Sequence, residues 1–277
     1  MAKTYQNFIP TLWSARLLAN LDKNLVYGDC VNRDYEGEIK GLGDTVKINR
    51  IGDITVGDYT GDVGTPEELS STQTTLVIDK AKYFNFKVED IEAVQANVNL
   101  VDQAMGRASF AIGDVIDQYV ASFTTSAGIK VGNTTTPKAL TTPAAAYDQL
   151  VDLKVELNKK NVSKMGRFVV VPPEFVGLLE KDDRFTKYSG KDVLSNGVVG
   201  NVAGFEIRES NNVPVASGKY SILAGTELAI SFAGQIAKVE PYRPEKSFSD
   251  AVKGLYVYGA KVLEPNAICC LTATFTA

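Results

Sequence analysis

The longest regular pattern in this 277-residue chain is an apolar repeat that runs from Val94 to Phe123. Its apolar residues recur at steps of three and four, the spacing that places side chains on one face of an α-helix. Asp90, just before the repeat, is a suitable N-cap. A helix of roughly 30 residues, rising ~1.5 Å per residue, would extend about 45 Å. Because few small domains contain so long a helix, the sequence predicts a spine on which other elements pack.

A long polar connection separates the strands that precede this helix. Gly43 to Arg50 alternates apolar with polar residues, and Thr74 to Val88 does so as one strand or two. Residues 51–73 between them are rich in Gly, Asp, Thr and Ser. Such a connection is unusual inside a compact domain, and an isolated two-stranded ribbon is poorly stable in water. We therefore expect a long hairpin that projects from the body and rests on a neighbouring copy of the chain.

The first forty residues predict an arm that carries a short amphipathic helix. Ile9-Pro10-Thr11 is a typical helix entry, and Gly28 is a suitable end. The apolar residues between them have helical spacing: Trp13, Leu17, Leu18, Leu21 and Leu25. A helix this short is marginal by itself, so it needs a partner surface on this chain or on another copy.

The rest of the chain predicts an α+β fold. Thr142-Pro143 begins a helix that extends to about Lys160. Arg167 to Val171 is a short apolar run typical of a buried strand, and Pro172-Pro173 ends it and starts a brief helix. A polar surface loop is expected at Glu180–Asn201. The remaining strands are expected at Gly204–Glu209, Lys219–Ala224, Leu228–Phe232, Ile236–Pro241, Gly254–Leu263 and Ala267–Phe275.

Composition argues against several functional classes. The chain has 29 basic and 33 acidic residues, a net charge of −4, and therefore lacks the basic footprint of a tight nucleic-acid binder. It contains no histidine, which removes imidazole-based nucleophile systems and zinc sites but leaves carboxylate or lysine chemistry open. Cys30, Cys269 and Cys270 suit small buried apolar positions better than disulfides. No apolar run suggests a signal peptide or membrane span, so we expect synthesis in a cytoplasm and no membrane.

The few motif-like segments favour ordinary structural roles. Gly41-Leu42-Gly43 lacks the third glycine and the helix of a dinucleotide fingerprint. The Gly-Asp pairs between Gly52 and Asp62 have the wrong spacing for a calcium loop and suit turns. Asp182-Asp183 lies beside basic residues and is expected to be solvated. We therefore expect no catalytic residue, no cofactor and no metal site.

Six segments of the second half occur in a recognisable order and spacing over about residues 170–275. They are Arg167–Glu174 (RFVVVPPE), Gly200–Ile207 (GNVAGFEI), Ser210–Pro214 (SNNVP), Ile230–Ala233 (ISFA), Phe248–Gly254 (FSDAVKG) and Tyr258–Pro265 (YGAKVLEP). In these segments the chain resembles the major capsid (coat) proteins of tailed bacteriophages that have the Hong Kong 97-type fold. The first half agrees with that family by its layout.

The resemblance implies a domain arrangement: an N-terminal arm at 1–40, an extended β-hairpin loop at 41–88, a peripheral domain with a long spine helix at 89–126 and 227–277, and an axial domain at 127–226. It further implies self-assembly, as a structural protein and not an enzyme, into an icosahedral shell of hexamers and pentamers. The shell would enclose the double-stranded DNA of the phage without sequence-specific binding and form the virion. A separate scaffolding protein and a portal are the other partners implied.

Contacts between copies are expected where the arm, the hairpin and the polar loops carry exposed apolar or basic side chains. The residues expected to make them are Trp13, Arg16, Leu17, Val56, Tyr59, Arg184, Arg243 and Lys246. The mixed charges from Lys238 to Lys261 suit salt bridges between copies. Some relatives crosslink a loop lysine to an asparagine near the C-terminus. No lysine lies between Lys47 and Lys80, so Asn266 would lack a partner and no crosslink is expected.

Three other interpretations remain open at this point. A nanocompartment shell of the same fold, as in encapsulins, would enclose an enzyme in place of DNA, because a fold does not fix a function. An enzyme using carboxylates or lysine would need polar groups that converge in a pocket. Another phage structural protein, such as a tail tube or decoration subunit, is disfavoured by the long spine helix.

Overall fold

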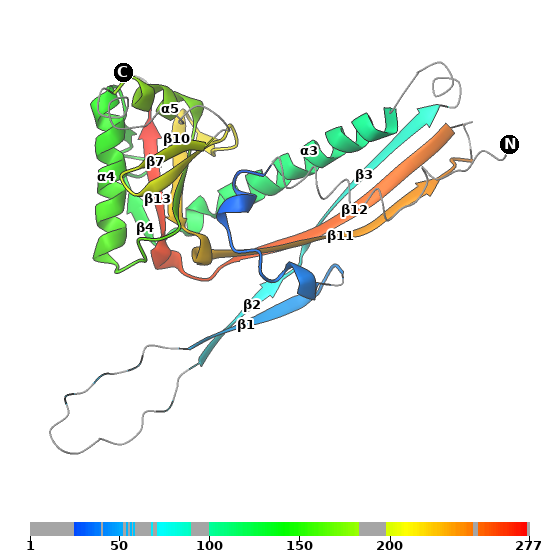
Figure 1. Cartoon of the computed structure of the whole chain (residues 1–277), viewed down its shortest axis with the longest axis horizontal. Coiled ribbons are helices and arrows are strands. Elements are labelled where there is room, and N and C mark those ends of the chain that lie inside the picture. The colour runs from blue at the N-terminus through cyan, green and yellow to red at the C-terminus, as the bar shows by residue number, and fades with distance from the viewer. Residues whose placement is uncertain are drawn as a thin grey trace.

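The computed structural model describes residues 25–39, 41–51, 71–89, 100–182, 198–245 and 249–275, with the single positions 54, 56, 58 and 68. These residues form two bodies and a projecting hairpin (Figure 1). One body is a long three-stranded sheet lined by a helix. The other is an eight-stranded sheet with two helices packed against it. The mixture of helix and sheet confirms the α+β prediction.

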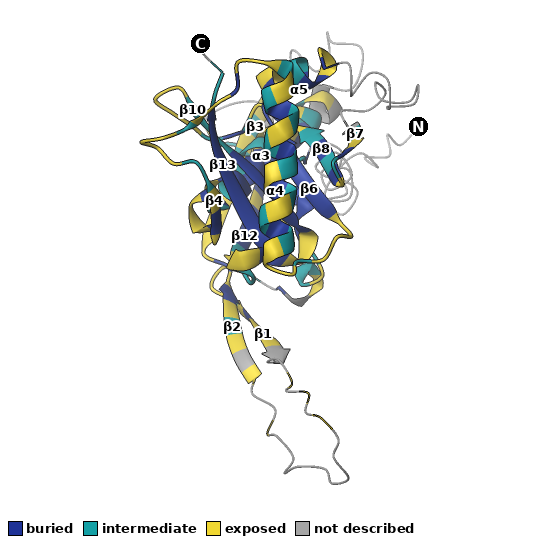
Figure 2. Cartoon of the chain, turned by 90° about the vertical axis from the view of Figure 1, so that its left-hand side faces the viewer, coloured by how far each residue is buried: buried dark blue, intermediate teal, exposed yellow. Residues whose placement is uncertain are grey.

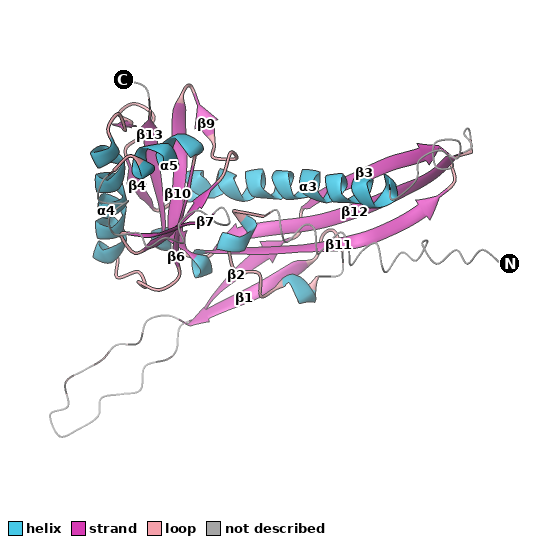
Figure 3. Ribbon diagram, turned by 45° about the horizontal axis from the view of Figure 1, so that its top comes forward, coloured by secondary structure: helices cyan, strands magenta, loops and turns pink. Residues whose placement is uncertain are grey.

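The three-stranded sheet has the order β11 (Ile230–Tyr242), β12 (Ser249–Val262) and β3 (Lys80–Glu89), all antiparallel. Helix α3 (Leu100–Ala121) lies along one face of it (Figure 3). Alternate strand residues, among them Phe84, Val252 and Tyr256, share a core with Met105 and Ile116 of the helix. The helical repeat and the strand alternation thus meet at one interface, and the expected spine is present.

The bounds of several elements differ from the sequence prediction, most clearly at the end of the long helix and in β11. The α-helix ends at Ala121 and continues as a 3-10 turn, η3 (Ser122–Ser126), while the expected cap Asp90 lies outside the described residues. The expectation of separate strands at Leu228–Phe232 and Ile236–Pro241 is wrong, because β11 is continuous. A bulge between Ile236 and Lys238 absorbs the irregular pattern. Gly234 also does not break the strand: it makes room for the hydroxyl of Tyr256, which a Cβ there would overlap.

The eight-stranded sheet has the order β4-β13-β10-β6-β8-β7, with β5 paired to β13 and β9 paired to β10. The strands are β4 (Ile129–Val131), β5 (Lys138–Ala139), β6 (Arg167–Val171), β7 (Val198–Val202), β8 (Phe205–Glu209), β9 (Val215–Ala216), β10 (Lys219–Thr226) and β13 (Ile268–Thr274). Strand β6 is buried along its whole length, as its apolar sequence predicts. The sheet includes parallel pairs, β6 with β8 and β13 with β4.

Helices α4 (Pro143–Lys159) and α5 (Pro173–Glu180) pack against this sheet. Thr142 caps α4 as predicted: its side chain accepts a hydrogen bond from the Ala145 N–H at 3.3 Å, and Pro143 occupies the first turn. Buried and exposed stripes alternate along α4 (Figure 2), the pattern of an amphipathic helix. The buried stripe is Ala146, Leu150, Leu153 and Leu157.

Two segments belong to this sheet although the sequence suggested otherwise. Strand β13 lies between β10 and β4, so the last strand of the range 227–277 is not part of the three-stranded sheet. Its side chains alternate between the two cores, Cys270 in one and Cys269 in the other. The expected loop Glu180–Asn201 ends in strand β7, which pairs with β8. Residues 183–197 of that loop lie outside the described part of the chain.

Candidate assembly surface

The predicted hairpin is present and projects away from both bodies (Figure 1). Strands β1 (Thr45–Ile51) and β2 (Ser71–Val77) pair antiparallel through seven registered positions, from Thr45 with Val77 to Ile51 with Ser71. The second predicted strand, Thr74–Val88, divides at residues 78–79. Its first part belongs to the hairpin, and its second part is β3 of the three-stranded sheet.

The root of the hairpin is buried on its own chain. One face of the ribbon carries Val46, Ile48, Leu76 and Ile78, all of which are buried. These side chains share a cluster with Ile39, and with Ala233 and Val257 of the sheet below. The expectation that the whole ribbon rests on a neighbouring copy is therefore wrong for the root. The alternation of apolar residues gives the ribbon a face that its own sheet can cover.

A close backbone approach seats the root on β12. A Cβ added at Gly259 would overlap the carbonyl oxygen of Val77 and lie 3.0 Å from the Val77 carbonyl carbon and 3.1 Å from the Ile78 Cα. Gly259 pairs in register with Ala233 on β11, so two small residues form the seat. The connection between β2 and β3 passes directly over a position where only glycine fits.

Polar contacts also fix the root. The Gly43 N–H donates to the Ile78 carbonyl at 2.9 Å, and the Ile78 N–H donates to the Asp44 carbonyl at 2.9 Å. The Asp44 carboxylate accepts from the Gly41 N–H at 2.8 Å. Gly43 has a φ of +93°, a conformation that other residues rarely adopt. The direction in which the hairpin leaves the body is thus set within the subunit.

Two apolar residues described beyond the paired strands are exposed to solvent. Ile54 is 66% exposed and Val56 is 93% exposed. The surrounding segment, residues 51–70, contains five acidic residues and no lysine or arginine. The opposite face of the ribbon is exposed at Lys47, Asn49 and Gln73, and the Gln73 amide donates to the Asn49 side-chain oxygen at 3.1 Å. Exposed apolar groups in a segment of acidic composition fit contact with another molecule better than packing on this one.

A second exposed surface is the face of the three-stranded sheet that points away from α3. Tyr83 of β3 and its cross-strand partner Leu255 of β12 are 78% and 38% exposed. The hydroxyl of Tyr242 donates to the Asn85 side-chain oxygen at 3.0 Å, and the Lys253 ammonium lies 5.3 Å from the Tyr242 ring centre.

The charges on this face are arranged around Glu240. The ammonium groups of Lys238 and Lys253 both approach the Glu240 carboxylate and hold the pKa of that carboxyl below its ordinary value. Exposed aromatic rings are enriched on surfaces that bind other protein chains, whereas lysine–glutamate pairs such as these suit the polar rim of such a surface.

Two of the predicted contact residues lie among the described residues. Val56 is exposed on the distal hairpin, and Arg243 is exposed just after β11. The other six, Trp13, Arg16, Leu17, Tyr59, Arg184 and Lys246, lie outside the described residues. The contacts expected of all eight stay predictions.

Asp117 of α3 is a site that the sequence did not reveal. The residue is 2% exposed, and its carboxylate accepts three backbone hydrogen bonds, from Val26 at 2.9 Å, Tyr27 at 3.1 Å and Gly28 at 3.0 Å. Burial raises the pKa of the Asp117 carboxyl to about 6, although the three N–H donors act in the opposite direction. A single acidic residue on the flank of an apolar repeat is normally solvated, so periodicity gave no signal.

The described residues offer little for chemistry. They contain no group of three or more Cys, Asp and Glu side chains that could hold a metal ion. All three cysteines are buried, and burial raises the pKa of the Cys269 thiol to about 12. Asp182, expected to be solvated, is buried directly after α5, where its N–H donates to the Leu179 carbonyl at 3.0 Å. No helix among the described segments is long and apolar enough to cross a membrane.

Comparisons with known proteins point to one class. A family model described as "Phage capsid protein" matches residues 72–271. A solved structure from Mycobacterium phage Che8 is 31% identical, with a TM-score of 0.70 over 89% of this chain and 90% of that one. The capsid of cyanophage P-SCSP1u is 16% identical, with a TM-score of 0.67 over 91% and 89%.

A virus-like particle from Pyrococcus furiosus has the same fold at 13% identity, with a TM-score of 0.58 over 95% of this chain and 98% of that one. No curated protein sequence matches this chain.

Proposed function

Since this chain belongs to the phage capsid protein family, we propose that it builds its shell by placing the distal hairpin of each copy on the next copy. The chain is a structural major capsid protein with the Hong Kong 97-like fold, and it acts as one of many repeated subunits of a capsid. Its function lies in its contact surfaces, which join each copy to its neighbours at fixed angles.

The hairpin is the observation that carries this proposal. Its root is buried on its own subunit, whereas Ile54 and Val56 beyond it are exposed. The surface that provides the hairpin differs from the surface that receives it, so copies join head to tail. They form closed rings where the rotation from one copy to the next permits. Each contact can be modest, because association costs offset much of the buried area. Once a subunit has formed one contact, its other contacts form at a high effective concentration, so a subunit that touches several neighbours is held firmly.

The finer assignments complete the proposal. The rings would be hexamers and pentamers, with the arm at 1–40, a peripheral region on α3 and the three-stranded sheet, and an axial region on the eight-stranded sheet. The shell would enclose double-stranded DNA without sequence-specific binding, consistent with the net charge of −4. A separate scaffolding protein and a portal would take part in assembly in the host cytoplasm.

A deletion tests the role of the hairpin. Residues 52–70 are replaced by an Asn-Gly turn, which closes β1 onto β2 and leaves the buried root intact. We expect a folded subunit whose melting temperature matches the unaltered chain and which forms no shells in electron micrographs. A matched control exchanges the same segment for an equally long one that retains Ile54, Val56 and the five acidic residues, and it should still assemble. Intact shells from the deleted chain would contradict the proposal.

One similarity supports a second candidate, a shell that encloses an enzyme instead of a genome. The Pyrococcus furiosus virus-like particle shares this fold over nearly the whole of both chains. Fold alone does not decide the cargo. Particles purified from the native source would contain DNA in the first case and a protein of fixed stoichiometry in the second.

A further inference from the structure

The two sheets are joined by three short turns that lie together. The chain passes between the sheets at η3 (Ser122–Ser126), η4 (Glu227–Ala229) and η5 (Pro265–Ala267), each a 3-10 turn. The turns are tied to one another. The Gly128 N–H, just after η3, donates to the Pro265 carbonyl at 2.8 Å, and the Leu263 N–H, before η5, donates to the Ala229 carbonyl at 2.9 Å. Short turns between two rigid bodies are suited to small rotations.

Residues 25–33, which we call the junction segment, cross this line of turns without belonging to either sheet. Asn32 binds the beginning of β11: its N–H donates to the Ile230 carbonyl at 3.0 Å, and its carbonyl accepts from the Phe232 N–H at 2.8 Å. The Asn32 N–H also lies 3.1 Å from the Glu227 carbonyl of η4. One end of the segment is thereby attached to the three-stranded sheet and to a connecting turn.

The other end of the junction segment is held by α3 and reaches the eight-stranded sheet. Asp117 accepts the three N–H groups of residues 26–28, which lie at and just before η1 (Gly28–Cys30). The Asp29 carboxylate lies 3.7 Å from the Arg208 guanidinium of β8, which also binds Glu206 at 2.8 Å. The segment is therefore attached to both sheets and to helix α3, which lines the first of them.

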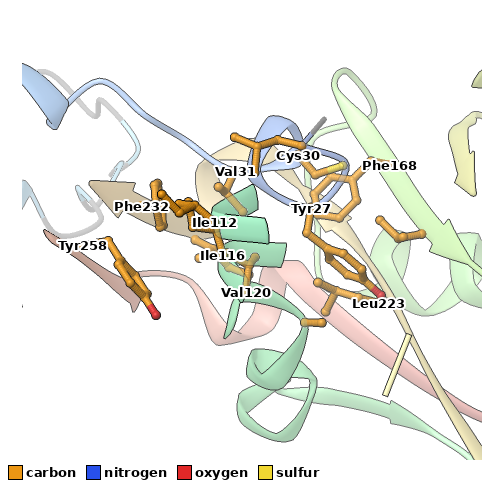
Figure 4. Packing of buried hydrophobic residues seen from close by; sticks show 14 of the residues in the cluster. Tyr27, Cys30, Val31, Ile112, Ile116, Val120, Phe168, Leu223, Phe232 and Tyr258 are labelled. Carbon is orange, nitrogen blue, oxygen red and sulfur yellow. The ribbon is translucent and has the colours of Figure 1, made fainter. Parts of the chain in front are cut away.

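Side chains of the segment fill the space where the bodies meet. Tyr27, Cys30 and Val31 share one core with Phe232 of the three-stranded sheet and Leu223 of the eight-stranded sheet. Figure 4 shows the Tyr27 ring directed toward Leu223, below Phe168. Rotation of one body against the other would have to move these rings.

The hydroxyl of Tyr27 is buried and has no hydrogen-bond partner among the described residues. Burial raises the pKa of Tyr27 above its ordinary range. The Tyr27 side chain is therefore held at the junction by the packing of its ring against both sheets, and not by a hydrogen bond of its hydroxyl to a described residue.

We propose that the junction segment sets the angle between the two sheets, with Asp117 as its positioning residue, and thereby the curvature that each subunit contributes to the shell. The part that concerns the shell rests on the function proposed above, whereas the part that concerns the angle is a property of the single subunit. A chain that fits both five-fold and six-fold surroundings needs such an adjustable but limited joint.

Distance measurements on the isolated subunit test the angle directly. Spin labels on cysteines placed at Gln103 of α3 and Asp152 of α4, both exposed, report the separation of the two bodies. The three native cysteines are buried and should not react. We expect Asp117→Asn to at least double the width of the distance distribution, because a neutral amide cannot accept all three N–H groups. Arg208→Gln, which loosens the other attachment, should broaden it in the same direction.

Glu156→Gln removes one charge from the exposed side of α4 and is the matched control, with no broadening expected. If Asp117→Asn does not fold, the width of the distance distribution in Arg208→Gln is the deciding measurement. Distributions as narrow as that of the unaltered subunit in both variants would overturn the proposal. A merely structural role would lower the melting temperature and leave the width unchanged.

The same variants are then assembled and the shell diameters are measured by electron microscopy. A wider range of diameters is expected for Asp117→Asn and Arg208→Gln, and unchanged diameters beside a broadened angle would overturn the link to curvature. Failure of the unaltered chain to form any shell would instead contradict the proposed function, and the spin-label result would stand by itself.

Discussion

Replacing Gly259 by alanine should loosen the hairpin without unfolding the subunit. The new methyl group would overlap the Val77 carbonyl oxygen and crowd the backbone at Ile78, so the connection between β2 and β3 has to retreat. Overpacking of this kind typically costs about 1–3 kcal/mol, and we take the upper value because backbone atoms are displaced and not a flexible side chain.

The anchoring of the root is larger than this cost. Val46, Ile48, Leu76 and Ile78 are all buried in the root cluster. At about 1.5–3 kcal/mol for each buried side chain, their burial contributes about 6–12 kcal/mol as an upper estimate. The hairpin therefore stays seated on average, but a penalty of ~3 kcal/mol makes its local opening about a hundred times more frequent.

Hydrogen exchange is the appropriate assay. We expect amides of residues 74–78 to exchange about a hundredfold faster in Gly259→Ala, while those of β6 and β10 in the other sheet keep their rates. Gly106→Ala is the matched control, since a Cβ at that position of α3 meets no atom within 4 Å. It should stabilise the helix by about 0.5–1 kcal/mol. Unchanged exchange at residues 74–78 would show that the root does not rest on Gly259 in solution.

Two further predictions concern a turn and a buried carboxyl. Ala203 and Gly204, between β7 and β8, have φ angles of +54° and +87°, and an Asn-Gly pair suits such a turn better than Ala-Gly. Ala203→Asn should therefore raise the unfolding free energy, measured by thermal or denaturant unfolding, by about 0.5–1 kcal/mol. A lower unfolding free energy would mean that the packing of the Ala203 methyl group matters more than the turn conformation. The folded-state pKa of Asp117, about 6, lies above its ordinary 3.8, so the folded chain keeps this proton longer than the unfolded chain and stability falls as pH rises between these values. Relative to Asp117→Asn, the unaltered chain should lose about 2 kcal/mol between pH 4 and 7 in denaturant titrations, and a constant difference would contradict the shift.

Elements with strong local patterns were predictable from the sequence. The three-and-four repeat of α3, the cap and proline of α4, and the apolar run of β6 each specify their own structure. Short strands were not: β4, β5 and β9 have two or three residues each, too few to show an alternation. They form because the neighbouring strands β13 and β10 offer unpaired backbone groups.

The assembly surface was predictable only where a local sequence pattern specifies it. The polar composition of residues 51–73 indicated a projecting hairpin, and the alternation of β1 indicated a strand with one apolar face. Which surface covers that face depends on Ala233 and Gly259, almost two hundred residues away, and no local pattern reveals such a partner. The burial of Asp117 likewise depends on backbone N–H groups 89 to 91 positions earlier in the chain.

The fixed root of the hairpin has a genetic consequence. In a shell built by head-to-tail placement, a copy that lacks residues 52–70 can still receive the hairpin of one neighbour, but it offers nothing to the next. Such a copy would act as a terminator of growth and not as an inert bystander. A small fraction of truncated chains, co-expressed with the full-length chain, would then inhibit assembly more than its abundance predicts. The truncated gene would behave as a dominant-negative allele.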